Sequence, residues 1–140
     1  MLILDTDHLS ILNQDTMEAF NIGRRLSAAP PSEVFVTIIT FEEQMRGWLA
    51  YIAQAKTPAQ QLEAYHRLRQ FVERYREIAL LDYDAEAASQ LEKLQQARVR
   101  IGTMDLKIAA ICLANDATLL TRNTQDFGRV PGMKFEDWSA

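Results

Sequence analysis

The sequence predicts one α/β domain, in which a central, mostly parallel sheet of about five strands lies between two layers of helices. Short apolar runs alternate along the chain with segments of helical periodicity. The first four runs lack the in-out alternation of a sheet with one solvent-exposed face, so we expect these strands to be buried on both sides. Helices between buried strands imply right-handed crossovers. A three-layer α/β/α fold over residues 1–140 follows.

The strands are predicted from five short segments. In chain order these lie at residues 1–5, 34–38, 78–82, 118–121 and 133–136. Residues 29–32 contain two prolines and are expected to form a loop into the second strand. No internal repeat or low-complexity linker divides the chain, which favours a single domain.

The clearest helix signals lie in the middle of the chain. Thr57 and Pro58 supply an N-cap and a proline in the first turn. Apolar residues then recur at helical spacing, namely Leu62, Tyr65, Leu68, Phe71 (or Val72) and Tyr75. Asp84 is predicted to begin another helix. One face of that helix carries Ala88, Leu91, Leu94 and Ala97.

The composition fits a single well-packed domain. The chain has 140 residues, of which 48% are hydrophobic, and this suffices for a full core. The single cysteine, Cys112, has no partner for an internal disulfide and is expected to fill the core as a small apolar residue. One cysteine and two histidines are too few for an ordinary structural zinc site.

Charge and hydropathy indicate a cytoplasmic protein that does not enter a membrane. No basic region or long apolar run precedes Asp5, so a secretory signal is not expected. No segment approaches the roughly 20 apolar residues of a membrane span. The net charge of -4 gives no general basic surface, so any binding of nucleic acid must use a local patch.

Acidic residues follow the predicted strands and indicate a divalent-metal site. Asp5 ends the first strand, Glu43 comes soon after the second, and Asp105 opens an apolar helix. Asp126, or Asn123, comes just after the fourth strand. Ligands of open α/β sheets lie outside the carboxyl ends of the strands, where residues distant in sequence meet. Mg²⁺ and Mn²⁺ prefer such oxygen ligands.

Each acidic residue also has a purely structural interpretation. Thr40 and Glu43 fit a capping box, and Asp5 suits the cap of the next helix. Asp105 would favour a helix dipole by about 0.3–1 kcal/mol. Asn123 and Asp126 could be an N-cap and a first-turn acid. The arrangement of all of them together, more than any single residue, carries the prediction of a site.

Four ordered segments resemble the PIN-domain nucleases, and more narrowly the VapC-type toxins of bacterial toxin–antitoxin pairs. The segments are residues 2–7, residues 37–43 with Gly47 beyond them, residues 102–110, and residues 120–127. The ending at residues 135–138 is similar too. The resemblance covers nearly the whole chain. It implies a PIN-like α/β/α fold and a metal-dependent endoribonuclease.

The resemblance also implies the identity of the site residues. Asp5, Glu43 and Asp105 match the first three acids of the family. The fourth position is open, and we rank Asp126 above Asn123 because an asparagine offers an oxygen but no charge. The expected ligands of Mg²⁺ or Mn²⁺ are thus Asp5, Glu43, Asp105 and Asp126. The chain departs from the family at Asp7, where asparagine is usual, and this acid either adds charge near the metal or caps the next helix.

A metal held by these acids would bind the scissile phosphate and lower the pKa of an attacking water. The expected partners are an RNA substrate, a small VapB-type antitoxin and a second copy of the chain. Candidates for contacts with RNA phosphates are Arg46, Lys107 and Arg122, although solvated surface charges are the simpler interpretation. Trp48 and Tyr51 could stack on bases, but their helical spacing favours packing or a protein interface.

The two histidines carry weaker predictions. His8 follows the strand-end acid and is a minor candidate for the site, whereas His66 is expected on a helix surface.

Two alternative functions fit parts of the sequence. Asp5-Thr6-Asp7 after a strand resembles the nucleophile and second acid of haloacid-dehalogenase-type phosphohydrolases, which form an aspartyl-phosphate. No later acidic pair has the spacing of that family. A catalytically silent PIN-like binding module is the other alternative, because Asn123 replaces a charged residue.

Overall fold

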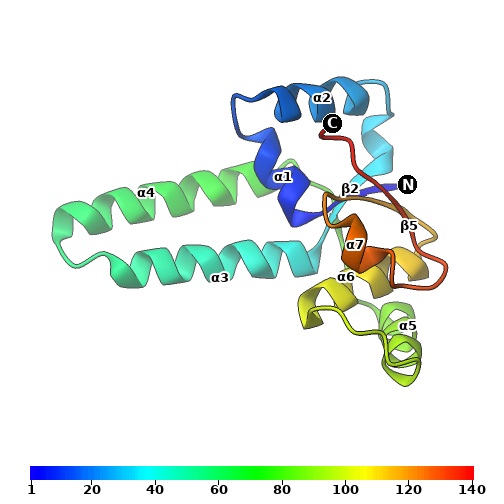
Figure 1. Ribbon diagram of the computed structural model, residues 1–140. Coiled ribbons are helices and arrows are strands. Elements are labelled where there is room, and N and C mark those ends of the chain that lie inside the picture. The colour runs from blue at the N-terminus through cyan, green and yellow to red at the C-terminus, as the bar shows by residue number, and fades with distance from the viewer.

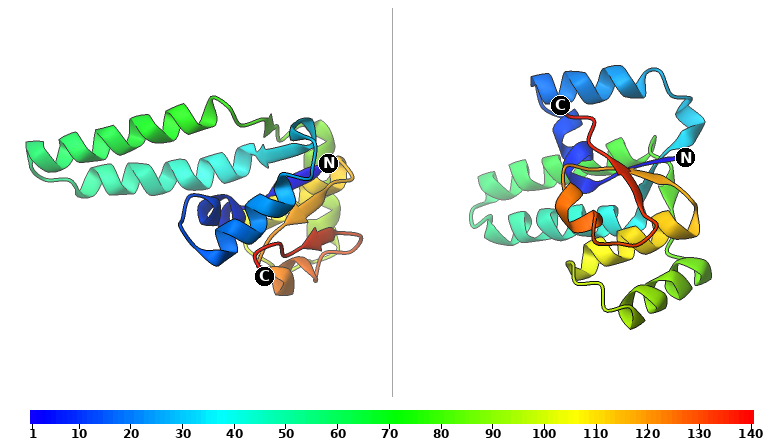
Figure 2. Two further views of the ribbon diagram at one scale, coloured as in Figure 1. Left: turned by 90° about the horizontal axis from the view of Figure 1, so that it is seen from above. Right: turned by 45° about the vertical axis from the view of Figure 1, so that its right-hand side comes forward.

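The computed structural model describes residues 1–140 and contains one five-stranded sheet (Figures 1 and 2). The strands are β1 (Leu2–Leu4), β2 (Val34–Thr37), β3 (Leu80–Leu81), β4 (Thr118–Leu120) and β5 (Lys134–Glu136). Their order is β3-β2-β1-β4-β5, and every neighbouring pair is parallel. All five predicted strands are confirmed, each somewhat shorter than expected. The central strand is β1, where the connections change direction across the sheet.

Helices connect the strands. They are α1 (Thr6–Leu12), α2 (Met17–Leu26), α3 (Ile38–Gln54), α4 (Pro58–Tyr75), α5 (Ala85–Gln96), α6 (Thr103–Ala114) and α7 (Thr124–Phe127). The predicted loop at residues 29–32 runs into a 3-10 turn at Pro31–Glu33. No helix is both long enough and apolar enough to pass through a lipid bilayer.

Successive side chains along each strand point to opposite faces of the sheet, and each face has its own hydrophobic core. Ile3 and Leu119 point into a core shared with α5 and α6, which includes the buried Cys112. Leu4 and Leu120 point into a second core, which is shared with α1 and α2. The α/β/α prediction and the core role of Cys112 are therefore confirmed.

The edge strand β3 departs from the sequence prediction. We expected the first four strands to be buried on both sides, but Leu80 is 37% exposed. The strand has only two residues and pairs with β2 alone. At the edge of the sheet, its residues are covered incompletely, so this part of the prediction is wrong.

Helices α3 and α4 form a long antiparallel hairpin that projects from the sheet (Figure 1). The predicted start of α4 is confirmed, because Thr57 caps it in a capping box and Pro58 follows. Its predicted apolar face is buried only near the sheet. Phe71 is buried, whereas Leu62 and Tyr65 near the tip are 75% and 58% exposed. Periodicity thus identified the helix but not what covers it.

Helix α5 begins at the predicted cap, because the Asp84 carboxylate accepts a hydrogen bond from the Ala87 amide. Of the predicted face, Leu94 is buried but Ala97 is exposed. Ala97 lies at the C-cap position, where the helix ends.

Candidate functional site

Asp5 directly follows the central strand β1 and is 5% exposed. Its Oδ1 accepts a hydrogen bond of 2.9 Å from the Thr6 amide, which makes it the N-cap of α1. Its Oδ2 accepts a bond of 2.7 Å from the Thr121 hydroxyl at the end of β4. Burial, with repulsion from Asp7 and Asp105, raises the pKa of Asp5 to about 7. The Asp5 carboxylate therefore caps α1 and also lies close to the other acids.

Glu43 lies one turn into α3 and faces the start of α1. The Thr6 hydroxyl donates to its Oε1 at 3.0 Å. Burial, followed by repulsion from Asp105, raises the pKa of Glu43. The alternative capping box is wrong, because Thr37 caps α3 by accepting a hydrogen bond from the Thr40 amide. Glu43 is free of a capping role and points toward the other acids.

Asp105 lies in the first turn of α6. A helix N-terminus should lower the pKa of a carboxyl group. The pKa of Asp105 is nevertheless raised, through burial and through repulsion from Asp126 and Asp7. Desolvation and neighbouring charges thus outweigh the effect of the helix dipole on the pKa of Asp105.

Asn123 occupies the N-cap position of α7, but its side chain does not cap that helix. Its Nδ2 instead donates to Asp126 Oδ2 at 3.1 Å and to Asp105 Oδ2 at 3.4 Å. Asp126 is also approached by Arg129, whose Nη1 lies 3.7 Å from Oδ1. Asn123 and Asp126, the two candidates for the fourth position, therefore lie beside Asp105. The neutral amide of Asn123 bridges the carboxylates of Asp105 and Asp126.

Asp7 is held between two segments at the rim of the site. Its Oδ1 lies 2.8 Å from His8 Nδ1. Its Oδ2 accepts a hydrogen bond of 3.0 Å from the Arg122 amide and lies 3.3 Å from the Thr121 hydroxyl. The sequence prediction missed the hydroxyls of Thr6 and Thr121, although Thr6 directly follows Asp5 and Thr121 directly follows β4.

The donor set suits a hard divalent cation. Only carboxylate, hydroxyl and amide groups converge, and no lysine or arginine forms an ion pair with Asp5, Glu43 or Asp105. The acids raise one another's pKa, so a cation would relieve their repulsion. In this arrangement, however, no three acidic, histidine or cysteine side chains are placed so that they could hold a metal ion.

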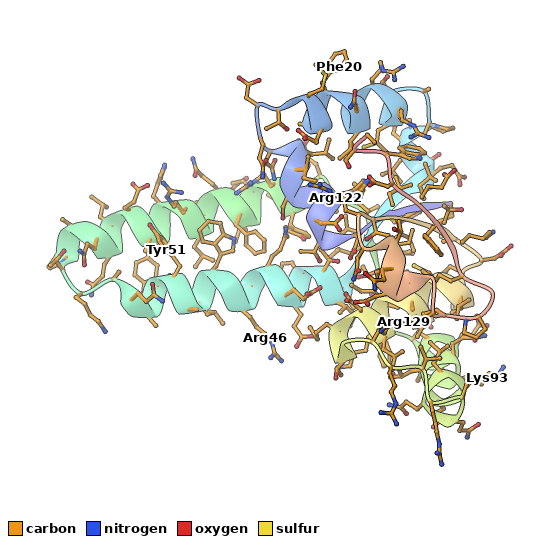
Figure 3. The ribbon with its side chains drawn as sticks, in the orientation of Figure 1. Phe20, Arg46, Tyr51, Lys93, Arg122 and Arg129 are labelled. Carbon is orange, nitrogen blue, oxygen red and sulfur yellow. The ribbon has the colours of Figure 1, made fainter.

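The other candidates lie in three different places: near the acidic site, in a separate groove and on the exposed surface of α3. Arg122 lies near α1 and α7, close to the acids, whereas Arg46 points away from them and pairs with Glu42 (Figure 3). Tyr51 lies between the two arms of the hairpin. A groove of about 710 Å³ between α1, α3 and α4 is lined by Trp48 and Tyr51, which pack edge to face. These aromatics therefore belong to the groove.

The two histidines lie in different surroundings. His8 contacts Asp7 at the rim of the site. His66 is exposed on α4, as expected for a helix-surface residue.

Sequence comparison relates the chain to known nucleases. The family model described as the PIN domain matches residues 2–133. The tRNA(fMet)-specific endonuclease VapC of Shigella flexneri is 37% identical over 66 residues, which cover 44% of this chain and 50% of that protein. Ribonuclease VapC2 of Rickettsia felis is 41% identical over 46 residues, which cover 33% and 34%. The chain thus matches half or less of the length of these curated relatives.

Solved structures share the fold over the whole chain. The crystal structure of VapBC2 from Rickettsia felis bound to a promoter DNA fragment has a chain with a TM-score of 0.71 at 22% identity, covering 98% of both chains. FitAcB from Neisseria gonorrhoeae has a chain with a TM-score of 0.71 at 21% identity, covering 99% of both. At such identities, the likeness shows the fold alone.

Proposed function

Because the chain belongs to the PIN-domain family, we propose that it is a divalent-metal-dependent endoribonuclease and the toxin of a toxin–antitoxin pair. The observation that carries the proposal is the convergence of Asp5, Glu43 and Asp105, whose pKa values are all raised by burial and by neighbouring carboxylates. Such crowding of unpaired carboxylates costs stability and is typical of functional sites. The family assignment overturns the haloacid-dehalogenase alternative.

Asp5, Glu43 and Asp105, with Asp126 as the fourth acid, would hold Mg²⁺ or Mn²⁺. The bound ion would supply charge neutralisation at the scissile phosphate and a lowered pKa for the attacking water. The Thr121 and Thr6 hydroxyls orient Asp5 and Glu43, so that these carboxylates keep fixed directions. Without a cation, the acids repel an RNA backbone.

The exposed Arg122 is the candidate for a phosphate contact. It stands beside Asn123, and its backbone is fixed by Asp7. A phosphate contact orients the RNA without reading its sequence. Lys107 is half-buried on α6 and stays a weaker candidate.

Cleavage of RNA by the purified chain tests the activity. Total RNA and initiator tRNA, the substrate in the names of two relatives, should be cut with Mg²⁺ or Mn²⁺ and remain intact with EDTA. Asp5→Asn and Asp105→Asn should each lower the rate by at least about a hundredfold, which corresponds to about 2.7 kcal/mol in the barrier. Both swaps are nearly isosteric, so thermal melts should show folded protein.

Glu92→Gln, on the exposed surface of α5, is the matched control for loss of a carboxylate. Full activity in both site variants would refute the assigned site. Metal binding without any cleavage by the wild type would instead favour a catalytically silent PIN-like module.

The groove between α1, α3 and α4 is the proposed docking site for a VapB-type antitoxin. Its walls carry Trp48, Phe71 and Tyr75, and Arg67 and Arg74 also line it. Aromatic walls with basic residues suit an amphipathic helix that has an apolar face and acidic neighbours. The family resemblance further implies self-association into a homodimer.

Co-expression with the product of a small neighbouring gene tests this partner. Trp48→Ala and Arg74→Glu should weaken the complex, while RNA cleavage by the free chain stays near the wild-type rate. Exposed Lys93→Glu on α5, away from the groove, serves as the charge control (Figure 3). An unchanged complex in both groove variants would exclude the groove. Sedimentation of the chain alone tests the homodimer.

A further inference from the structure

The buried side chain of His8 connects two segments that are distant in sequence. It is 0% exposed. Its Nδ1 lies 2.8 Å from Asp7 Oδ1, and its Nε2 lies 3.0 Å from the backbone nitrogen of Trp138. Asp137 Oδ1 is 3.7 Å from the same Nε2, beyond hydrogen-bond distance. His8 therefore joins the start of α1 to the segment that follows β5.

The hydrogen bonds determine where the proton of the imidazole lies. The Trp138 amide can only donate, so Nε2 must present a lone pair to it. A neutral imidazole then carries its proton on Nδ1 and donates it to Asp7. The Trp138 end is firmly held, because its side chain is buried in the core that contains Leu4 and lies under Arg25, 4.6 Å from the ring centroid.

Asp7 connects His8 to the loop beside the proposed active site. While Oδ1 accepts from His8, Oδ2 accepts from the Arg122 amide. Arg122 begins the loop that carries Asn123 and Asp126 toward Asp105. Both oxygens of Asp7 thus face donors, and an asparagine would turn its own NH₂ group toward one of them. This explains physically why a carboxylate, with no donor of its own, suits this position beside His8.

We infer that His8 is a positioning residue for the ribonuclease proposed above: it holds the Asp7 carboxylate in one orientation and thereby fixes the loop at residues 121–123. The inference rests on the proposed function for its effect on cleavage. Its structural part, the link from Trp138 through His8 and Asp7 to Arg122, is measurable without any substrate or metal.

Two substitutions separate the two hydrogen bonds of His8. In His8→Asn, the amide nitrogen takes the place of Nδ1 and still donates to Asp7, but the Trp138 amide loses its acceptor. In His8→Gln, the side-chain oxygen reaches the place of Nε2 and still accepts from Trp138, but the donation to Asp7 is lost. A buried amide without an acceptor costs more than a half-exposed carboxylate that water can solvate.

The two variants should therefore rank in opposite order for stability and for activity. His8→Asn should melt at a lower temperature than His8→Gln, yet it should retain kcat within about threefold of the wild type. His8→Gln should melt at a higher temperature than His8→Asn but lose kcat by about tenfold relative to the wild type, with KM little changed. In metal-free protein, the Arg122 amide should exchange its hydrogen faster in His8→Gln than in His8→Asn, because Asp7 no longer holds it.

His66→Gln on the exposed face of α4 is the matched control and should change none of these readouts. The same ranking for stability and activity, or equal protection of Arg122 in both His8 variants, would overturn the inference and reduce His8 to a structural role. A wild type that cuts no RNA would refute the proposed function alone, since hydrogen exchange at Arg122 would still decide the positioning role.

Discussion

Asp5 caps a helix and is also a residue of the proposed metal site. It caps α1 through Oδ1 and receives the Thr121 hydroxyl through Oδ2, while its burial opposes ionisation. Isolated buried carboxylates usually shift their pKa and become neutral. Asp105 and Glu43 experience the same conflict more weakly, since they are less buried. A bound cation is the simplest group that would let all three ionise together.

The fourth acidic position can be assigned by three substitutions. Asp126→Asn should weaken metal binding by roughly tenfold or more, because it removes a charge within reach of Asp105. Asn123→Ala should weaken it less, because it removes only the amide that joins Asp105 and Asp126. Asn123→Asp should lower the melting temperature of the metal-free protein by adding a repelling charge and should raise metal affinity. Calorimetric titration, with thermal melts alongside, measures these effects.

A metal affinity that is unchanged from the wild type in all three variants would mean that neither Asn123 nor Asp126 is a ligand. The site would then consist of Asp5, Glu43 and Asp105, with Asp7 as the nearest additional acid.

At the scale of elements, α6 and the α3–α4 hairpin differ in how far their apolar residues are buried. Residues 108–112 of α6 are all buried, between the sheet and α5. The hairpin buries Phe71 near the sheet, through contacts with Phe41 and Tyr75, but leaves its tip exposed. Helix α6 therefore stabilises the domain and positions Asp105, whereas the hairpin presents a surface.

Truncation of one apolar residue in each helix should show this difference. Ile108→Ala should cost about 2–5 kcal/mol of unfolding free energy, because it leaves a cavity in a fully buried position. Leu62→Ala, at a residue that is 75% exposed, should change it by less than about 0.5 kcal/mol. Urea denaturation of the metal-free chain measures both. A large loss for Leu62→Ala would indicate that the tip is already covered in solution, as by a second copy.

At the scale of the whole molecule, a net charge of -4 is distributed so that several acids meet at one end of the sheet. Arginine and glutamate pairs elsewhere, such as Arg67 with Glu63, lie on exposed helix surfaces and contribute little to stability. The electrostatic cost of the fold is therefore concentrated at the site.

Stability of the metal-free protein should fall as the pH rises from about 4 to about 7. The ordinary pKa of an exposed aspartate is 3.8, whereas the pKa of Asp5 in the fold is about 7. The folded protein therefore binds more protons than the unfolded chain in this window, and stability decreases with pH. The loss should reach at most a few kcal/mol, since one unit of pKa corresponds to about 1.4 kcal/mol. The raised pKa values of Glu43 and Asp105 act in the same direction.

Thermal melts across this range in EDTA test the prediction. Asp5→Asn should flatten the dependence, and Mg²⁺ should restore stability at pH 7 and above by binding the folded state. A stability that rises with pH in EDTA would contradict the raised pKa of Asp5.

The sequence by itself determined the strands, the helix caps at Thr57 and Asp84, and the acids that gather at the sheet. These follow from local patterns of apolar and capping residues, and from the rule that strand ends meet at one edge. The sequence did not decide whether Asn123 or Asp126 is the fourth site residue, and it suggested Thr40 as the cap of α3 where the structure has Thr37.

Only the tertiary structure decided what covers each apolar face and which donors reach each acid. Leu62 lies on the predicted apolar face of α4 and Leu80 lies in a strand that was expected to be buried, yet both are exposed. Burial depends on neighbouring elements, which periodicity does not specify. His8 contacts Trp138 across 130 residues of sequence, and no local pattern encodes that contact. The position of a side chain along its own element is a local property, whereas its partners are set by how the elements pack.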